Sequence, residues 1–281
     1  MRFLVTGSAG MLGRDVVAAA GRAGHDVVAL TRRDLDITEP RAVARTVLDV
    51  RPAAVVNCAA WTDVDGAEAR EAEATAINGA GAGAVARAAA EAGALIVHVS
   101  SDYVFAGTGD RPYVESSPVG PLSAYGRSKL AGERAVAEAS PRHAIVRSSW
   151  LFGPGGRNFV DTMLALAAER DEVTVVDDQV GSPTYTGHLA AALVAVAERG
   201  LTGVLHVAGG GECSWHDLAA AAFAATGAEV RLQRGRTADL GRPAPRPAYS
   251  VLRSERDEAP RLPDWREGLA AHLAASREAV A

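Results

Sequence analysis

The stretch LVTGSAGMLG, residues 4–13, places three glycines directly after a short apolar run. Gly7, Gly10 and Gly13 have the spacing G-x-x-G-x-x-G, and a helical pattern begins at Met11. Glycines at these positions let the backbone turn tightly and approach a pyrophosphate at the N-terminus of the following helix. A strand before the turn and a helix after it are the context that dinucleotide binding requires. An ordinary glycine-rich turn is the alternative.

Beyond this turn, short β-branched runs alternate with longer alanine-rich segments. The runs predicted as buried strands are Arg2–Val5, Asp26–Leu30, Ala53–Asn57, Ala94–Ser100 and His143–Ser148. The predicted helices between them lie near Met11–Ala23, Pro40–Val50, Glu68–Ala92 and Ser123–Ala139. This alternation predicts an α/β fold, a Rossmann-type doubly wound parallel sheet with helices on both faces. Because ligands bind beyond the carboxyl ends of such strands, functional residues should directly follow the runs.

The second half of the chain loses this rhythm from about Leu151. The elements predicted there are helices near Phe159–Glu169, Gly187–Glu198, Ser214–Thr226 and Asp264–Ala281, with strands at Val173–Val176 and Gly203–Val207. We predict an NADP-binding Rossmann domain over residues 1–152. Residues 153–281 should form a smaller, mixed α/β domain that mainly binds substrate, although a segment near residues 178–208 should return to the first sheet.

Composition excludes several classes of protein. A net charge of −5 argues against a nucleic-acid binder, which needs an excess of basic residues. Cys58 and Cys213 are too few for a disulfide framework or a thiolate metal site, and the seven histidines show no ligand spacing. No apolar run approaches the length of a membrane span, and the N-terminus does not resemble a signal peptide. We expect a cytoplasmic protein without metal, membrane or nucleic-acid partners.

The end of the second predicted strand indicates which nicotinamide cofactor is used. Folds that prefer NAD usually carry an acidic residue there, which binds the ribose 2′-hydroxyl. This chain has Thr31, Arg32 and Arg33 at that point, and guanidinium groups suit a 2′-phosphate. The sequence therefore predicts NADPH, with NADH as the alternative. Asp36 and Ile37 are candidates for the adenine pocket.

The only lysine of the chain, Lys129, follows Tyr125 by four residues on a predicted helix, so the two share a face. A phenol with a pKa near 10 is a poor acid–base catalyst until a nearby cation favours its ionised form. A slender ammonium can supply that charge and also bind the nicotinamide ribose, whereas arginine presents a planar fork. Ser101, at a strand end, would hold a substrate carbonyl while Tyr125 transfers a proton.

Together, the glycine turn, the strand-end serine and Y-x-x-x-K resemble the extended short-chain dehydrogenase/reductase family. Within it, six segments spread over nearly the whole chain are similar to the dTDP-4-dehydrorhamnose reductase family: Asn57–Glu68, Ser100–Gly107, Tyr125–Glu133, Arg147–Val160, Asp178–Thr184 and Arg246–Leu252. The resemblance implies that NADPH reduces the C4 keto group of dTDP-4-dehydro-6-deoxy-L-mannose to give dTDP-L-rhamnose. It also implies that Tyr125 is the proton donor.

The resemblance further implies roles for individual residues. The catalytic set would be Ser101, Tyr125 and Lys129, although the family often carries threonine where Ser101 stands. The predicted cofactor-binding residues are Gly7, Gly10, Met11, Leu12, Gly13, Thr31, Arg32, Arg33, Asp36, Ile37, Ala59, Ala60, Asn78, Tyr125 and Lys129. The predicted substrate-binding residues are Thr62, Val64, Ser101, Asp102, Trp150 and Arg246. Asn78 would support the lysine through water, and Arg246 would grip the substrate diphosphate.

Other interpretations stay open at this point. Arg246 lies in a segment, Arg231–Arg256, that can also be read as a solvated basic loop, and Trp215 and Trp265 are predicted to be packing residues. Some relatives form metal-bridged dimers, but Tyr185–His188 offers no carboxylate to complement Asp15, so no magnesium bridge is carried over and a monomer or homodimer is expected. The alternative functions are a 4-ketoreductase for another deoxysugar nucleotide and a non-catalytic, dinucleotide-binding regulatory subunit.

Overall fold

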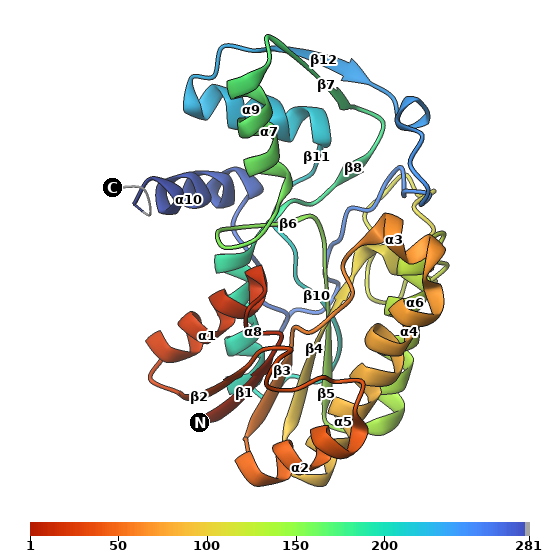
Figure 1. Cartoon of the computed structure of the whole chain (residues 1–281), viewed down its shortest axis with the longest axis vertical. Helices are drawn as coiled ribbons and strands as arrows, with labels where there is room; N and C mark the ends of the chain where they lie inside the picture. The colour runs from red at the N-terminus through yellow and green to blue at the C-terminus, as the bar shows by residue number, and fades with distance from the viewer. Residues whose placement is uncertain (279–281) are drawn as a thin grey trace.

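A six-stranded parallel sheet forms the centre of the computed structural model, which describes residues 1–278 (Figure 1). The strand order is β10-β5-β4-β3-β1-β2. The strands are β1 (Arg2–Thr6), β2 (Asp26–Leu30), β3 (Ala54–Asn57), β4 (Leu95–Ser101), β5 (His143–Ser148) and β10 (Gly203–His206). The chain runs outward from β1 to β2 and then crosses back to β3, which confirms the predicted doubly wound fold.

Two helical layers cover the sheet because successive side chains of each strand point to opposite faces. Val5 and Val97 pack toward α1 and α8, whereas their neighbours Leu4 and Ile96 pack toward α2 and α5. The helices on these two faces are α1 (Met11–Arg22) and α8 (Thr186–Glu198) on one, and α2 (Pro40–Val50), α5 (Ala82–Glu91) and α6 (Ala124–Ala139) on the other. Burial on both faces explains the nearly continuous apolar runs of the strands.

The helix predicted near Glu68–Ala92 is present from Glu71 to Glu91, but it starts three residues late and contains a π-helical turn. The chain there is divided into α3 (Val64–Ala69), α4 (Glu71–Thr75), the π-helical turn η1 (Ala76–Gly81) and α5. The Asp63 carboxylate accepts a hydrogen bond from the Gly66 amide and starts α3 early, and Arg70 leaves helical geometry. The break at Arg70 therefore separates the short α3 from the alanine-rich helical segment that follows.

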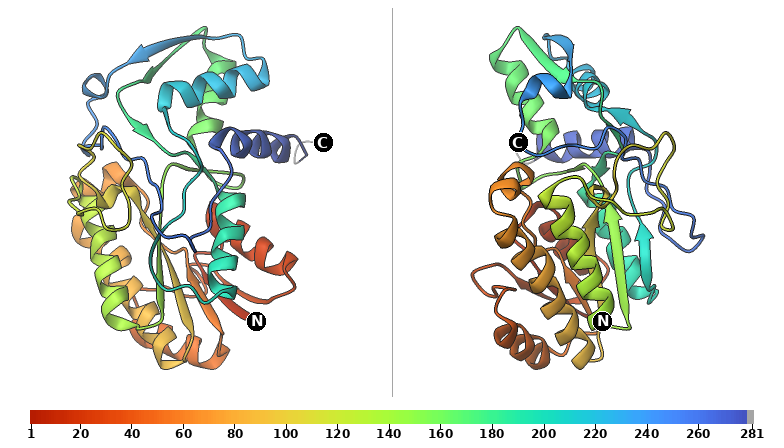
Figure 2. Two further views of the ribbon diagram at one scale, coloured as in Figure 1. Left: turned by 180° about the vertical axis from the view of Figure 1, so that it is seen from behind. Right: turned by 90° about the vertical axis from the view of Figure 1, so that its right-hand side faces the viewer.

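A smaller lobe lies at the opposite end of the molecule from α2 (Figures 1 and 2). Its elements are α7 (Phe159–Glu169), β7 (Glu172–Val176), α9 (Trp215–Thr226), β12 (Arg231–Gly235), the 3-10 turn η3 (Thr237–Leu240) and α10 (Trp265–Glu278). Short strands join it to the sheet: β6 (Leu151–Phe152), β8 (Val180–Gly181), β9 (Thr184–Tyr185) and β11 (Cys213–Ser214). The strand β12, which pairs in parallel with β7, lies in the segment that can be read as a basic loop, and the sequence did not predict it.

Part of the second half returns to the large sheet. The strand β10 pairs in parallel with β5, and α8 packs against α1 in the core. The division into NADP-binding and substrate-binding domains stays a prediction, and the last three residues of the predicted final helix lie outside the described part of the chain. Within residues 1–278, no helix combines the length and the apolar character needed to cross a bilayer.

Candidate active site

The glycine turn lies at the point where the strand order reverses, between the ends of β1 and β3. Gly7 has a left-handed φ of 67°, and a Cβ atom built on it would lie 2.6 Å from the Ala59 amide nitrogen. Gly10, the N-cap of α1, has no side chain to cap the first helical turn. The amide groups of that turn can therefore bind an anion. Ala59 and Ala60, both predicted to bind the cofactor, directly follow β3 beside this turn.

Gly13 offers a direct test of how tightly the turn is built. A Cβ atom there would lie 2.2 Å from the Gly7 carbonyl oxygen, so Gly13→Ala should displace the turn. We expect the variant to lose about 1–3 kcal/mol of unfolding free energy and at least about tenfold in NADPH affinity. Urea unfolding and calorimetric NADPH titration measure the two effects.

The matched control is Gly21→Ala, near the other end of α1. Nothing lies within 4 Å of a Cβ atom at Gly21, and alanine favours a helix by about 0.5–1 kcal/mol over glycine. This variant should keep full NADPH affinity and gain slightly in stability. Equal NADPH affinity in Gly13→Ala and the native protein would contradict the close-approach reading of the turn.

The segment after β2 places the two arginines of the cofactor prediction on the surface. Arg32 is largely exposed and its guanidinium lies 3.7 Å from the Asp36 carboxylate, so both can reorient toward a ligand. The Asp36 carboxylate also accepts bonds from the Thr38 amide and hydroxyl, at 2.9 and 2.7 Å. Ile37 is 4% exposed and belongs to the core between the sheet and α5. The proposed adenine-pocket residues are thus partly committed to the fold.

Ser101 and Tyr125 meet at the carboxyl end of β4. Ser101 is the last residue of that strand, and Tyr125 lies in the first turn of α6, whose N-cap Ser123 accepts a bond from Gly126 N at 3.1 Å. Burial raises the pKa of the Tyr125 phenol to about 12, while hydrogen bonding with the Ser101 hydroxyl lowers it. The phenol is therefore protonated at neutral pH and lies beside a second hydroxyl, as a proton donor requires.

Lys129 lies one helical turn further along α6 and is 3% exposed. Its Nζ donates a 2.7 Å hydrogen bond to the Val99 carbonyl of β4. Burial lowers the pKa of this ammonium to about 8, and the Glu133 carboxylate raises it. The group is mostly charged at neutral pH. It contacts β4 two residues before Ser101, and its place in the catalytic set stays a prediction.

Asp102 follows Ser101 and accepts a 3.0 Å hydrogen bond from the Ser101 hydroxyl. Burial raises the pKa of its carboxyl to about 6, although the hydrogen bond from Ser101 favours the ionised form. A carboxyl whose pKa is raised by burial, next to a hydroxyl, is typical of functional sites. The binding of a sugar hydroxyl by this carboxyl stays a prediction.

Asn78 lies in the π-helical turn and not in a continuous α-helix. Its Oδ1 accepts from the Trp61 amide at 2.8 Å, and its Nδ2 donates to the Trp61 carbonyl and to the Ser128 hydroxyl at 3.1 and 2.9 Å. The side chain thus ties the loop after β3 to α6 next to Lys129. That loop carries Thr62, a predicted substrate residue. Support of Lys129 through water stays a prediction.

Trp150 stacks on Trp215 with ring centres 3.6 Å apart and planes 3° from parallel. Its left-handed φ of 48° is unusual for a bulky residue and costs about 1–3 kcal/mol. Such strain marks a position that the surrounding fold enforces. The sequence assigned Trp215 to packing alone, and no local signal places it here: the antiparallel pairing of Gly181 in β8 with Cys213 in β11 brings the two indoles together.

Arg246 does not lie free in a solvated loop. Its guanidinium binds the Asp65 carboxylate through two hydrogen bonds of 2.9 and 3.0 Å, and Arg242 adds a third at 3.0 Å. The hydrogen bond from Arg246 holds the pKa of Asp65 at about 2. Asp65 follows Val64 at the start of α3, so the predicted substrate residues Val64 and Arg246 come together. A diphosphate would have to share the guanidinium with Asp65.

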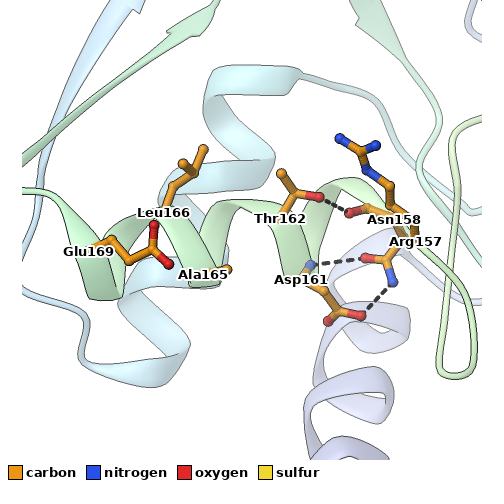
Figure 3. Close-up of a pocket in the computed structure, with 7 residues that line it drawn as sticks. All are labelled: Arg157, Asn158, Asp161, Thr162, Ala165, Leu166 and Glu169. Atoms are coloured by element: carbon orange, nitrogen blue, oxygen red, sulfur yellow. Dashed lines mark hydrogen bonds between the residues drawn. The ribbon is translucent and has the colours of Figure 1, made fainter.

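Other features of the surface lie apart from these residues. A hollow of 310 Å³ along α7 is lined by Arg157, Asn158, Asp161, Thr162, Ala165, Leu166 and Glu169 (Figure 3). It contains none of the predicted site residues, and Asn158 there caps its own helix by accepting from Asp161 N at 3.0 Å. A second hollow, of 530 Å³, lies along the outer face of α6.

Three potential metal ligands, Asp177, His216 and Asp217, lie within 4.8 Å of one another. The Asp177 carboxylate already accepts from the Ser214 hydroxyl at 2.9 Å and pairs with Arg234. Asp217 forms the capping box of α9 with Ser214. These bonds account for both carboxylates within the fold, and the absence of a metal site stays a prediction.

Comparison with known proteins gives a consistent result. The family model described as "RmlD substrate binding domain" matches residues 1–278. The chain is 47% identical to a dTDP-4-dehydrorhamnose reductase of Streptomyces griseus, over 96% of this chain and 91% of that protein. It is 46% identical to a dTDP-4-keto-6-deoxy-D-glucose reductase of Streptomyces niveus, over 89% and 88%.

A solved structure extends the comparison to the fold. The crystal structure of a Bacillus anthracis dTDP-4-dehydrorhamnose reductase in complex with NADP superposes with a TM-score of 0.95 at 37% identity, covering 98% of this chain and 99% of that one. The likeness spans both the sheet and the smaller lobe. The resemblance that the sequence motifs indicated is confirmed.

Proposed function

Because the chain belongs to the RmlD substrate binding domain family, the family of the dTDP-4-dehydrorhamnose reductases, we propose that it reduces dTDP-4-dehydro-6-deoxy-L-mannose to dTDP-L-rhamnose with NADPH. The observation that carries the proposal is that Tyr125 lies beside Ser101 at the end of β4, while Lys129, on the same helix as Tyr125, bonds Val99 of that strand. Ser101 and Lys129 are buried and Tyr125 is half-buried. A non-catalytic regulatory subunit would have no need of this proton-transfer set.

The glycine turn fits the cofactor because the positions nearest the pyrophosphate leave no room for a side chain. Gly7, Gly10 and Gly13 would hold the pyrophosphate, and Arg32 and Arg33 the 2′-phosphate. When bound, NADPH supplies the hydride that reaches C4 of the sugar. A monomeric or homodimeric state and a cytoplasmic location stay predictions.

The proton is the part of the reaction that the chain itself provides. In our proposal, Tyr125 gives the proton of its phenol to the C4 oxygen, which becomes a hydroxyl. The Ser101 hydroxyl turns from Asp102 and donates its hydrogen bond to the same oxygen. The Lys129 ammonium then stabilises the phenolate that remains on Tyr125. Asp102, Trp150, Thr62, Val64 and Arg246 would hold the sugar nucleotide around this centre.

The deciding experiment measures NADPH oxidation after the purified protein is mixed with dTDP-4-dehydro-6-deoxy-L-mannose, which is also called dTDP-4-dehydro-L-rhamnose. The product is identified by NMR. We expect oxidation in step with formation of dTDP-L-rhamnose. Absence of NADPH oxidation with this substrate would overturn the proposal.

A second candidate is reduction of another dTDP-4-keto-6-deoxysugar. It is favoured by the 46% identity to the Streptomyces niveus protein named dTDP-4-keto-6-deoxy-D-glucose reductase. The same catalytic residues would serve both reactions, because only the sugar and the face that receives the hydride differ. Parallel assays with both sugars, with the configuration at C4 read from the product, distinguish them.

The choice of cofactor can be tested at Arg32 and Arg33. Each guanidinium that binds the 2′-phosphate should contribute about 1.5–3 kcal/mol, so the double variant Arg32→Ala/Arg33→Ala should raise the KM for NADPH by at least about tenfold. The KM for NADH, which has no 2′-phosphate, should change little. Arg41→Ala, on the exposed surface at the start of α2, is the matched control. An equal rise in both KM values would argue against these two contacts.

A further inference from the structure

A buried ion pair lies directly behind the candidate active site. The carboxylate of Glu133 and the guanidinium of Arg147 are joined by two hydrogen bonds of 2.8 and 2.7 Å, and their side chains are only 6% and 5% exposed. The Ser100 hydroxyl donates a third bond, of 2.6 Å, to the same carboxylate. Removing two charges from water is costly, and apolar residues of similar volume often serve stability equally well. Stability alone therefore does not explain the pair.

The position of the pair connects it to the catalytic residues. Glu133 follows Lys129 by four residues on α6, so both lie on one face of that helix. Ser100 precedes Ser101 on β4 and is directly opposite Arg147 in the register of β4 with β5. The Glu133 carboxylate is thus fixed by the strand end that carries the catalytic hydroxyl and by the neighbouring strand.

The Glu133 carboxylate affects the protonation of Lys129. Burial lowers the pKa of Lys129, and Glu133 is the main group that raises it. Among the other titratable groups nearby, burial raises the pKa of the Cys58 thiol to about 12 and lowers the pKa of His98 and of His206. Two further carboxylates lie at the edge of the cluster: Glu115 accepts a hydrogen bond from the His206 amide, and Asp102 follows Ser101. His98 lies on β4, and His206, on β10, contacts the Arg147 guanidinium at 3.4 Å.

We propose that Glu133 is a positioning residue whose carboxylate, oriented by Arg147 and Ser100, keeps the buried Lys129 ammonium protonated for the proposed reaction. The role of Arg147 is to hold the carboxylate ionised and in place. This inference rests on the proposed function only in assigning Lys129 a part in the reaction. The electrostatic link between Glu133 and Lys129 can be measured without any substrate.

The test uses the fact that Lys129 is the only lysine of the chain. Protein grown with 13Cε-labelled lysine gives a single lysine side-chain resonance, and its shift against pH reports the titration of Lys129. Compared with the native protein, Glu133→Gln should move the midpoint down by about one pH unit. Arg147→Met leaves the buried carboxylate without the cation that holds it ionised, so this variant should lower the midpoint as well.

The double variant Glu133→Gln/Arg147→Met guards against loss of folding, because it leaves no unpaired buried charge. It should also show the lowered midpoint. An unchanged midpoint in both Glu133→Gln and the double variant would overturn the inference and leave the pair a structural feature. Reduction of the keto sugar by the native protein, assayed separately, decides the proposed function independently of this result.

Discussion

Replacing Tyr125 by phenylalanine is expected to lower kcat by about a thousandfold, while the affinity for NADPH stays close to that of the native protein. Positioned general acids contribute about 10²- to 10⁴-fold to a reaction, and phenylalanine removes only the acidic hydroxyl. The aromatic ring would keep its edge-to-face contact with Tyr103, whose ring centre lies 5.4 Å away. Turnover is measured by NADPH oxidation with the keto sugar in excess, and affinity by calorimetric titration with NADPH.

The matched control for this variant is Tyr103→Phe, because it removes the hydroxyl of the neighbouring tyrosine and keeps both aromatic rings. Its kcat should stay close to the native value. Full turnover in Tyr125→Phe would show that the proton comes from elsewhere. A large loss in both variants would indicate that the ring pair, and not the Tyr125 proton, limits the reaction.

Lys129→Arg is expected to reduce kcat by at least about a hundredfold although the positive charge is retained. The native ammonium is 3% exposed and lies 2.7 Å from the Val99 carbonyl, in a site enclosed by α6 and β4. A guanidinium is larger and planar, so it cannot take the same place without displacing the strand end that carries Ser101. The measurement is again NADPH oxidation, together with the melting temperature to detect damage to the fold.

Two further variants serve as controls for Lys129→Arg. Arg134→Lys, on the exposed side of the same helix, should leave kcat and the melting temperature unchanged. Lys129→Met removes the charge as well as the hydrogen bond and should lose at least as much activity as Lys129→Arg. If Lys129→Arg works as well as the native protein, the shape of the ammonium does not explain why the chain's only lysine is here.

The parts of the fold that the sequence predicted share one property: their signal is local. The strands β1, β3, β4 and β5 were recognised as apolar runs because each is buried on both faces. The prediction that β2 is buried was wrong, because β2 is the partly exposed edge strand of the sheet. The strand β12 has no such signal, since Arg231–Gly235 reads RLQRG and only its pairing with β7 makes it a strand. The break at Arg70, between α3 and α4, was missed because the capping carboxylate of Asp63 starts a separate short helix before it.

The candidate site divides in the same way. The sequence by itself determined the glycine turn and the Tyr125–Lys129 spacing, because a tight turn and an i to i+4 helical pair are properties of short segments. Asp65 and Arg246 are 181 residues apart, and Trp215 reaches Trp150 only through the pairing of β8 with β11. Glu133 likewise meets Arg147 only because β5 lies beside β4. These contacts depend on strand order and on the closure of long connections, which no short stretch of sequence encodes, so only the tertiary structure decided them.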